Sequence, residues 1–425
     1  MRKRSFEQLG ETLFEDTLPN GLRLCVVPKK GFRSFYALLA VNYGGAHRRF
    51  CLDGERFDMP AGVAHYLEHK MFDLPGGDDA MRKLTANGAD PNASTGADMT
   101  AYYFQCTENF EENLRLLLHF VSTPYFTEET VEKERGIITQ EILMGEDDPD
   151  LALYMRLLQM LYAAHPLRER VAGTVESIQS ITPETLSACH RAFYAPSNLA
   201  LCVEGDVDPE RVRAIAAELL PGEAGPMPEV DFGPEESLLP AESLYRGEAD
   251  VSAPQFLIGA KLRAEKQGEA ALRQRLTAVL AVQTLLGRSS PFFTELYTQG
   301  LINLDFFCEA DFLAGEGMVL LGGESRSPEQ VRSALLRTLE ELKKQGLDEQ
   351  RFERTKRASL GARLRGLEDF ETVCFALASG VFEGYCAFEG QLLLNEISRA
   401  ECERFLLDAL QPERLALAIF EPKGK

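Results

Sequence analysis

Apolar residues along this chain follow two different periods, and the segments they mark predict a mixed structure of strands and helices. Mostly apolar runs predict strands at residues 14–27, 34–43 and 199–204, and the first run is two strands joined by a turn at Pro19-Asn20-Gly21. Longer segments in which apolar residues recur every three or four positions predict helices. These helices are expected at residues 109–121, 128–145, 151–164 and 183–193.

One segment interrupts this pattern. Residues 221–240, PGEAGPMPEVDFGPEESLLP, are rich in Pro, Gly and acidic side chains, which is typical of a linker. We therefore divide the chain into a first domain at residues 1–220, a linker at 221–242 and a second domain at 243–425.

The two halves share a pattern that recurs at a constant offset along the sequence. This offset places Ile181-Thr182 on Ile397-Ser398, Pro196 on Pro412, and Leu199-Ala200-Leu201 on Leu415-Ala416-Leu417. A second correspondence pairs FTEETVEKER, from Phe126, with LDEQRFERTK, from Leu347. Because a helix, a proline and a strand recur in the same order, we interpret the halves as two tandem homologous domains of an α+β protein.

Composition narrows the class of protein. The chain has 425 residues, 45% of them hydrophobic and 26% charged, which is ordinary for packed globular domains. The net charge of −21 disfavours a nucleic-acid partner, whose phosphates reward clustered Lys and Arg. No apolar run is long enough to span a membrane, and the N-terminal residues lack the apolar core of a signal peptide. Nine scattered cysteines without C-x-x-C spacing predict reduced thiols, so we expect a cytoplasmic protein.

The motif with the clearest chemistry is His65-Tyr66-Leu67-Glu68-His69. On a helix, positions i, i+3 and i+4 share one face, so both imidazoles can reach one metal ion with the carboxylate beside it. Zinc binds imidazole nitrogen readily and, in catalytic sites, keeps a coordination position for water. Glu68 is then the candidate general base for hydrolysis. Taken singly, histidines on a helix are more often ordinary core or surface residues.

A third ligand is expected from a second helix. In residues 128–145, Glu134 and Glu141 lie seven positions apart, which is two helical turns, so they share one face. Glu141 can complete the site, with Glu134 behind it as a supporting carboxylate. On their own these glutamates would be interpreted as solvated helix residues. They become candidates for the metal site only because the histidine motif lies upstream.

At this point the chain resembles the insulinase or pitrilysin-type zinc metallopeptidases, which use the inverted His-x-x-Glu-His motif. In that family a Glu-x6-Glu pair follows the histidines, and its second member is the third zinc ligand. Here Glu134 and Glu141 form such a pair downstream of His69. The resemblance therefore implies Zn²⁺ as cofactor, held by His65, His69 and Glu141.

The resemblance extends over essentially the whole chain and is most evident for half-size bacterial members of the YmfH type. Residues 87–103, NGADPNASTGADMTAYY, are similar to the family's segment that leads into a substrate-binding edge strand. Residues 166–206 are similar to the helix and strand that close its first domain. This implies LuxS/MPP-like domains, each a mainly antiparallel sheet covered by helices. It also implies that Asn92, Ala93 and Ser94 bind substrate, although the crowding of Asn, Asp, Gly and Pro equally predicts a turn.

The second half lacks the histidine motif, and its position matching Glu141 falls near Ala362. In the family, an arginine and a tyrosine of a later domain help to fix substrate. Tyr297 and Asn303 stand at the matching positions here. In the family, half-size members often work as two-chain clamshells. The resemblance therefore implies that this chain is the zinc-bearing partner of a heterodimer with a paralogous subunit that lacks the zinc motif, a homodimer being the alternative.

The leading hypothesis is therefore a zinc-dependent endopeptidase that cleaves short or unfolded peptides, with Glu68 as its catalytic base. The rival hypothesis is a non-catalytic scaffold or peptide-binding subunit of a heterodimer, because the family also contains members that have lost catalysis. Such members are expected to have lost ligands or base, and here all four positions are filled.

Overall fold

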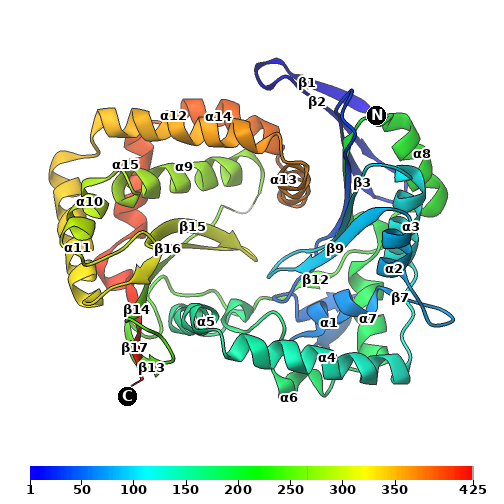
Figure 1. Cartoon of the computed structure of the whole chain (residues 1–425), viewed down its shortest axis with the longest axis horizontal. Helices are drawn as coiled ribbons and strands as arrows, with labels where there is room; N and C mark the ends of the chain where they lie inside the picture. The colour runs from blue at the N-terminus through cyan, green and yellow to red at the C-terminus, as the bar shows by residue number, and fades with distance from the viewer. Residues whose placement is uncertain (266, 424–425) are drawn as a thin grey trace. The chain divides into compact units, whose positions relative to one another are not determined.

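The computed structural model describes residues 1–265 and 267–423, and the chain forms two compact units. The first unit consists of Met1–Leu143, Glu169–Phe232 and Leu364–Ala387. The second consists of Met144–Arg168, Gly233–Arg363 and Phe388–Lys425. Each unit thus contains a segment from the opposite half of the sequence, so the units are not simply the first and second halves of the chain (Figure 1).

The first unit is built on a seven-stranded sheet in the order β1-β2-β3-β11-β4-β10-β9. Its neighbouring strands are antiparallel, apart from the parallel pair β3 and β11. The strands are β1 (Arg2–Phe6), β2 (Glu11–Thr17), β3 (Arg23–Pro28), β4 (Phe35–Val41), β9 (Ala89–Thr95), β10 (Thr100–Cys106) and β11 (Leu199–Gly205). Smaller pairings join β5 (Arg49–Leu52) to β6 (Glu55–Asp58) and β12 (Glu229–Val230), and β7 (Asp73–Leu74) to β8 (Asp78–Asp79).

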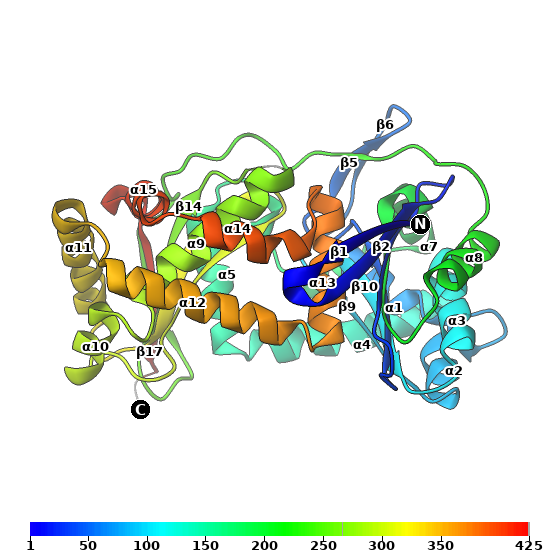
Figure 2. The same cartoon turned by 90° about the horizontal axis from the view of Figure 1, so that it is seen from above.

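Helices cover both faces of this sheet, which is why every residue of the central strand β11 is buried. The large apolar core lies on the side of α1, α3, α7 and α8, whereas α13 packs against β3, β4 and β11 on the other side (Figures 1 and 2). The helices of this unit are α1 (Val63–Lys70), α2 (Ala80–Ala86), α3 (Phe110–Ser122), α4 (Glu128–Glu146), α6 (Val175–Ile178), α7 (Pro183–Phe193), α8 (Pro209–Leu219) and α13 (Phe370–Glu383).

The second unit repeats this design on a five-stranded sheet in the order β13-β17-β14-β16-β15. Its strands are β13 (Leu244–Ala249), β14 (Gln255–Leu262), β15 (Phe307–Leu313), β16 (Glu316–Glu324) and β17 (Ala416–Pro422). Its helices are α5 (Pro149–Leu161), α9 (Gly268–Leu286), α10 (Pro291–Thr298), α11 (Pro328–Gln345), α12 (Glu349–Gly366), α14 (Gly390–Glu396) and α15 (Arg399–Ala409). Helix α5 packs on β14 and β17, where Gly259 leaves room for Leu157.

The predicted duplication appears in the structure as matching elements. The offset that relates Pro196 to Pro412 carries α7 onto α15, and the strand that follows, β11, onto β17. Both sheets place this last strand between a parallel neighbour and an antiparallel one. The second correspondence, which pairs Phe126 with Leu347, carries α5 onto α13, and each of these two helices packs on the sheet of the opposite half. The predicted α+β fold of two homologous domains, with mainly antiparallel sheets covered by helices, is confirmed.

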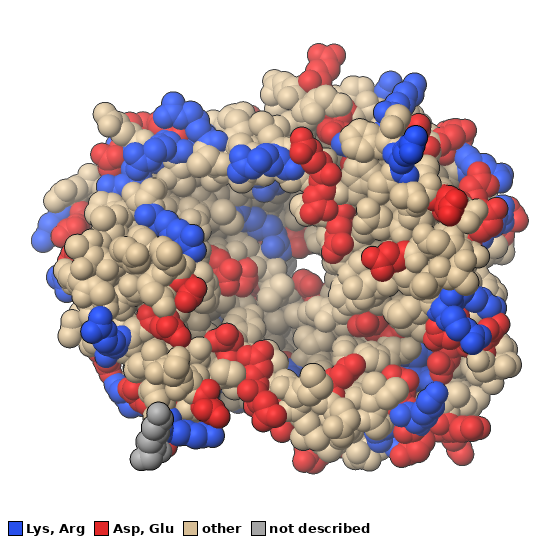
Figure 3. Space-filling view, viewed as in Figure 1, with Lys and Arg blue, Asp and Glu red and all other residues tan. Residues whose placement is uncertain are grey.

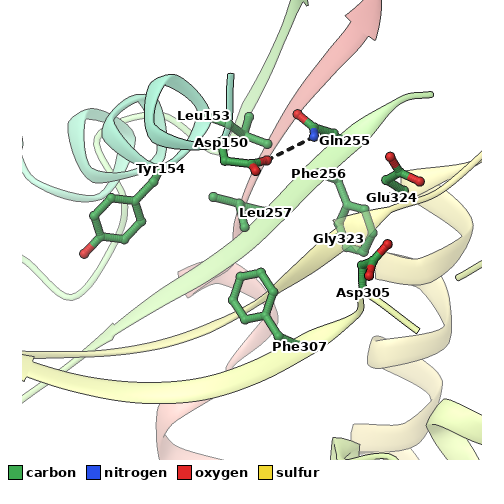
Figure 4. Close-up of a pocket in the computed structure, with 10 residues that line it drawn as sticks. All are labelled: Asp150, Leu153, Tyr154, Gln255, Phe256, Leu257, Asp305, Phe307, Gly323 and Glu324. Atoms are coloured by element: carbon green, nitrogen blue, oxygen red, sulfur yellow. Dashed lines mark hydrogen bonds between the residues drawn. The ribbon is translucent and has the colours of Figure 1, made fainter. Parts of the chain in front are cut away.

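The second unit contains a cavity of about 400 Å³ between α5 and one end of its sheet (Figure 4). Three carboxylates line it, those of Asp150, Asp305 and Glu324, together with apolar side chains that include Phe307. Asp150 accepts a hydrogen bond of 3.0 Å from the Gln255 amide. All of its lining residues belong to the second unit, and none was predicted from the sequence as a functional residue.

Charge is distributed as the composition predicts. The sequence has 66 acidic and 45 basic residues, and Figure 3 shows both kinds interspersed over the face in view. Among the described residues, no helix combines the length and apolar character needed to cross a bilayer. Within the same part of the chain no disulfide is formed, and eight of the nine cysteines are buried.

Candidate metal centre

The helix that carries the histidine motif, α1, starts at a close approach between two backbone segments. Gly62 precedes α1 with φ of 94°, and a Cβ there would lie 2.6 Å from the Ala172 carbonyl oxygen. Gly173 faces it with φ of 74°, and its Cβ would lie 2.5 Å from the Ala61 oxygen. The Ser177 hydroxyl donates to that same Ala61 oxygen at 2.8 Å. Glycine is needed at both positions because side chains would collide with carbonyl groups.

Two buried polar side chains of α1 hold the second helix of the site, α4, in position. The Tyr66 hydroxyl donates to the Val131 carbonyl, and the Lys70 ammonium group donates to the Thr130 carbonyl at 3.1 Å. Both side chains are almost fully buried. Both hydrogen bonds end on backbone carbonyl groups in the first turns of α4. Together they fix the position of α4 relative to α1.

The docking of the two helices brings three predicted ligand atoms together. His65 Nε2 lies 3.8 Å from Glu141 Oε2, and His69 Nε2 lies 3.5 Å from the same oxygen. One donor atom of each residue lies within 4.8 Å of the others. Zinc bonds of about 2.0–2.1 Å in a tetrahedron would place ligand atoms about 3.3 Å apart. Both nitrogen–oxygen distances are close to that value, and the set of two imidazole nitrogens and one carboxylate oxygen fits a zinc ion in donor type.

Glu134 orients one of the two imidazoles. Its Oε1 lies 3.0 Å from His69 Nδ1, on the ring edge away from Glu141. A proton on Nδ1 would be donated to Glu134, leaving the Nε2 lone pair free to bind a metal. Burial lowers the pKa of His69, but the hydrogen bond to Glu134 and the nearby carboxylates outweigh it, so the net shift is upward. For Glu134, burial raises the pKa, and the hydrogen bond and charge of His69 reverse the shift.

His65 is held differently. Its Nδ1 is buried and has no hydrogen-bond partner among the described residues. Burial, followed by the charge of His69, lowers the pKa of His65 to about 4. The ring is therefore neutral at physiological pH, which is the state that a metal ligand requires.

Glu68, the predicted base, is 8% exposed and lies on the same helix between the two histidines. The Thr95 hydroxyl donates to Glu68 Oε2 at 2.6 Å. Burial raises the pKa of Glu68, and the Thr95 hydrogen bond opposes that shift. A carboxylate with raised basicity beside a candidate metal site is suited to accept a proton from water.

Asn92, Ala93 and Ser94 lie in β9, the outermost strand of its sheet, which β10 borders on one side. The segment is therefore an extended strand, and the alternative interpretation as a turn is wrong. Asn92 and Ser94 are exposed, whereas Ala93 and Thr95 are partly buried on the face that α1 covers. Their contact with substrate remains a prediction.

Apart from Glu134, the residues that support this site were not predicted from the sequence. Tyr66 stands inside the motif and Lys70 directly after it. The available signal was a lysine next to the histidine pair. Thr95 could have been found by strand parity, since it shares a face with Ala93. Nothing in the sequence around Gly62 or Gly173 indicates that glycine is required there, because their close approach joins segments that are distant in the sequence.

The second unit provides no counterpart of these ligands at the matching positions. Ala362, at the position matching Glu141, lies in α12. Tyr297, on α10, is 47% exposed and stacks on Phe293. The Asn303 amide donates to the Glu324 carboxylate at 3.0 Å.

Two family models match this chain. Residues 53–175 match the family model described as insulinase, peptidase family M16, and residues 180–359 match the model described as the peptidase M16 inactive domain. The first match includes the histidine motif and both helical glutamates. The second begins after them.

Relatives along the full length show the family. An uncharacterized zinc protease of Bacillus subtilis, YmfH, is 35% identical over 433 residues, covering 99% of each chain. An M16-like peptidase from Alicyclobacillus acidocaldarius superposes with a TM-score of 0.93 at 30% identity, covering 97% of this chain and 99% of its own. A protease from Helicobacter pylori, at 20% identity, shares the fold with a TM-score of 0.80, over 96% of this chain and 99% of its own. The chain belongs to the M16 family of zinc peptidases.

Proposed function

We propose that this protein is a zinc-dependent endopeptidase that cleaves short or unfolded peptides, with Glu68 as its base. The observation that carries the proposal is the convergence of His65 Nε2, His69 Nε2 and Glu141 Oε2 beside the buried Glu68 carboxylate. Family membership and the full-length zinc-protease relative support it.

The chain's own residues divide the work. Zn²⁺ held by His65, His69 and Glu141 would supply Lewis acidity, which acidifies water and polarises a peptide carbonyl. Glu68 accepts the proton of the attacking water and returns it to the amine that leaves. Glu134 keeps the His69 ring in the orientation and tautomer that ligation requires.

The substrate class follows from the edge strand. An extended peptide can add to the outer side of β9, where backbone groups of Asn92, Ala93 and Ser94 would pair with it. Backbone pairing accepts many sequences but requires an unfolded segment. We therefore expect short or unfolded peptides rather than folded proteins.

The chain is proposed to act with a partner. Tyr297 and Asn303 replace the arginine and tyrosine that the family resemblance leads us to expect, so a paralogous subunit without the zinc motif would supply them in a heterodimer. A homodimer is the alternative. Co-purification of the native chain, followed by peptide cleavage with and without the accompanying protein, separates the two. Equal activity of the pure single chain and of the complex would contradict the division of function between two subunits.

A cytoplasmic location completes the proposal. The nine cysteines, all within the described residues, form no disulfide, and reduced thiols on this scale are typical of a reducing compartment.

The second candidate function is a non-catalytic scaffold or peptide-binding subunit. The description of the model that matches residues 180–359, an inactive domain, favours it for that half. The filled ligand and base positions of the first unit favour catalysis instead.

A Glu68→Gln variant separates these functions. The amide keeps the size of the side chain but cannot take up the proton, so we expect peptide cleavage to fall by at least about 100-fold. Zinc content, measured by mass spectrometry of the metal, should stay unchanged. The matched control is Glu129→Gln, an exposed glutamate in the first turn of α4. Cleavage at the parent rate by Glu68→Gln would overturn the role of Glu68 and favour the scaffold.

A further inference from the structure

We infer that Thr95 is a positioning residue that holds the Glu68 carboxylate in its working orientation. The inference rests on the proposed peptidase function and adds to it a residue outside the ligand set. Its basis is the 2.6 Å hydrogen bond from Thr95 Oγ1 to Glu68 Oε2.

The direction of that hydrogen bond follows from counting protons. Thr100 Oγ1 is buried and donates its only proton to the Tyr43 carbonyl at 2.8 Å. At its contact of 3.3 Å with Thr95, Thr100 can therefore only accept. The shorter contact to Glu68 takes the Thr95 proton, because a carboxylate is the stronger acceptor. The hydroxyl of Thr95 is thus committed to one oxygen of the base.

The backbone on either side of Thr95 is fixed as well. Thr95 is the last residue of β9, and it pairs with Thr100 across the hairpin to β10. The anchored Thr100 side chain in turn ties this end of the hairpin to the backbone of Tyr43. A hydroxyl on such a support has little freedom to follow Glu68, so Glu68 must adjust to it.

This placement links the base to the strand proposed to take the substrate. Asn92 and Ser94 present one face of β9, and Thr95 presents the opposite face toward α1. The strand β9 would therefore set two things: the register in which a substrate peptide pairs with it, and the position of the Glu68 carboxylate. Orientation of a reacting group has large effects, since a misplacement of about 1 Å can cost about 100-fold in rate.

The test compares Thr95→Val, which replaces the hydroxyl with a methyl group, with Thr95→Ser, which keeps the hydroxyl. The control is Thr12→Val, a partly buried strand residue of β2 in the same sheet. Each full-length variant is studied with any partner that co-purifies. For Thr95→Val we expect kcat to fall about 10- to 100-fold while KM stays within about twofold. Thr95→Ser should recover most of kcat.

Two further readouts do not depend on activity. Zinc affinity, from competition with a chelator, should match the parent in all three variants. Crystals of metal-free Thr95→Val should show the Glu68 carboxylate turned from its parent position. If Thr95→Val fails to fold, Thr95→Ala removes the hydroxyl without adding volume.

The outcomes distinguish the role of Thr95 from the proposed function. An active parent with unchanged kcat in Thr95→Val overturns the role of Thr95 and leaves the peptidase proposal standing. Equal losses in Thr95→Val and Thr95→Ser, or a loss explained by missing zinc, also overturn it. A parent complex that cleaves no peptide counts against the proposed function and the role of Thr95 together.

Discussion

His69 Nδ1 lies 3.0 Å from Glu134 Oε1, so the far edge of the ring presents Nε2 to Glu141. Glu134 and Glu141 stand two turns apart on one helix, and the imidazole lies between their carboxylates. One carboxylate therefore orients the ring, and the other lies beside it in the proposed metal site.

Removing the orienting carboxylate should weaken the metal site without deleting a ligand. We expect Glu134→Ala to weaken zinc binding about 10- to 100-fold, because His69 loses the partner that fixes its tautomer and rotation. Glu134→Gln should lose less, since the amide oxygen can still accept from Nδ1. Chelator competition gives the Kd, with Glu129→Ala as the exposed control on the same helix. Equal affinity of Glu134→Ala and the parent would show that the ring is oriented by other contacts.

The start of the motif helix should tolerate no side chain. Gly62→Ala forces a Cβ to within 2.6 Å of the Ala172 oxygen. Gly54→Ala is the matched control, since Gly54 also has positive φ, of 83°, but has open space around it. Both variants should lose about 1–2 kcal/mol from the left-handed backbone. Gly62→Ala should lose about 1–3 kcal/mol more from the collision.

Urea unfolding of the zinc-free proteins measures both free energies. Equal losses in Gly62→Ala and Gly54→Ala would mean that the backbone near Ala172 moves aside without cost, and that the close approach does not constrain α1.

A buried carboxyl group in the first unit should make stability depend on pH. Glu204 is fully buried on β11, with Lys29 at 3.2 Å. Burial raises the pKa of Glu204 from 4.5 to about 8, and the charge of Lys29 opposes the shift only in part. Between these pH values the unfolded chain releases the proton and the folded chain keeps it. We therefore expect the contribution of Glu204 to stability to fall as pH rises through this window and to level off above pH 8.

The Glu204→Gln variant has no carboxyl group to titrate at this position. The stability of the variant relative to the parent should therefore increase with pH. Relative to the parent, we expect the Tm of Glu204→Gln to rise by roughly 5 °C between pH 5 and pH 8.5. Glu129→Gln, at an exposed site, should show no such trend. A Tm difference that is constant with pH would mean that Glu204 is already ionised in the folded protein.

Local sequence signals predicted much of the framework. Residues 183–193 were predicted as a helix, and α7 spans Pro183–Phe193, with Thr182 capping its first turn and Pro183 as its first residue. The internal repeat places α15 and β17 correctly because duplicated halves keep the same spacing between cap, helix and strand. The histidine motif is also a local signal. Its spacing of three and four residues matches one turn of a helix, and the motif does lie on the helix α1.

Glu134 and Glu141 were assigned to the histidine motif through the family resemblance, whereas other contacts between distant segments escaped prediction. The exchange of α5 and α13 between the two sheets has no local cause, because each helix would look the same packed on its own half. Thr95 reaches Glu68 only because β9 lies against α1. The approach of Gly62 to Ala172 likewise joins two loops that the sequence separates.

The proposed chemistry depends above all on two imidazoles and the Glu141 carboxylate holding one zinc ion. Diffraction data from zinc-loaded crystals, collected on both sides of the zinc absorption edge, locate that ion directly. We predict a single strong anomalous peak bonded to His65 Nε2, His69 Nε2 and Glu141 Oε2. A peak bonded to other residues, or one with the Glu141 side chain turned away, would show that these three groups do not form the metal site.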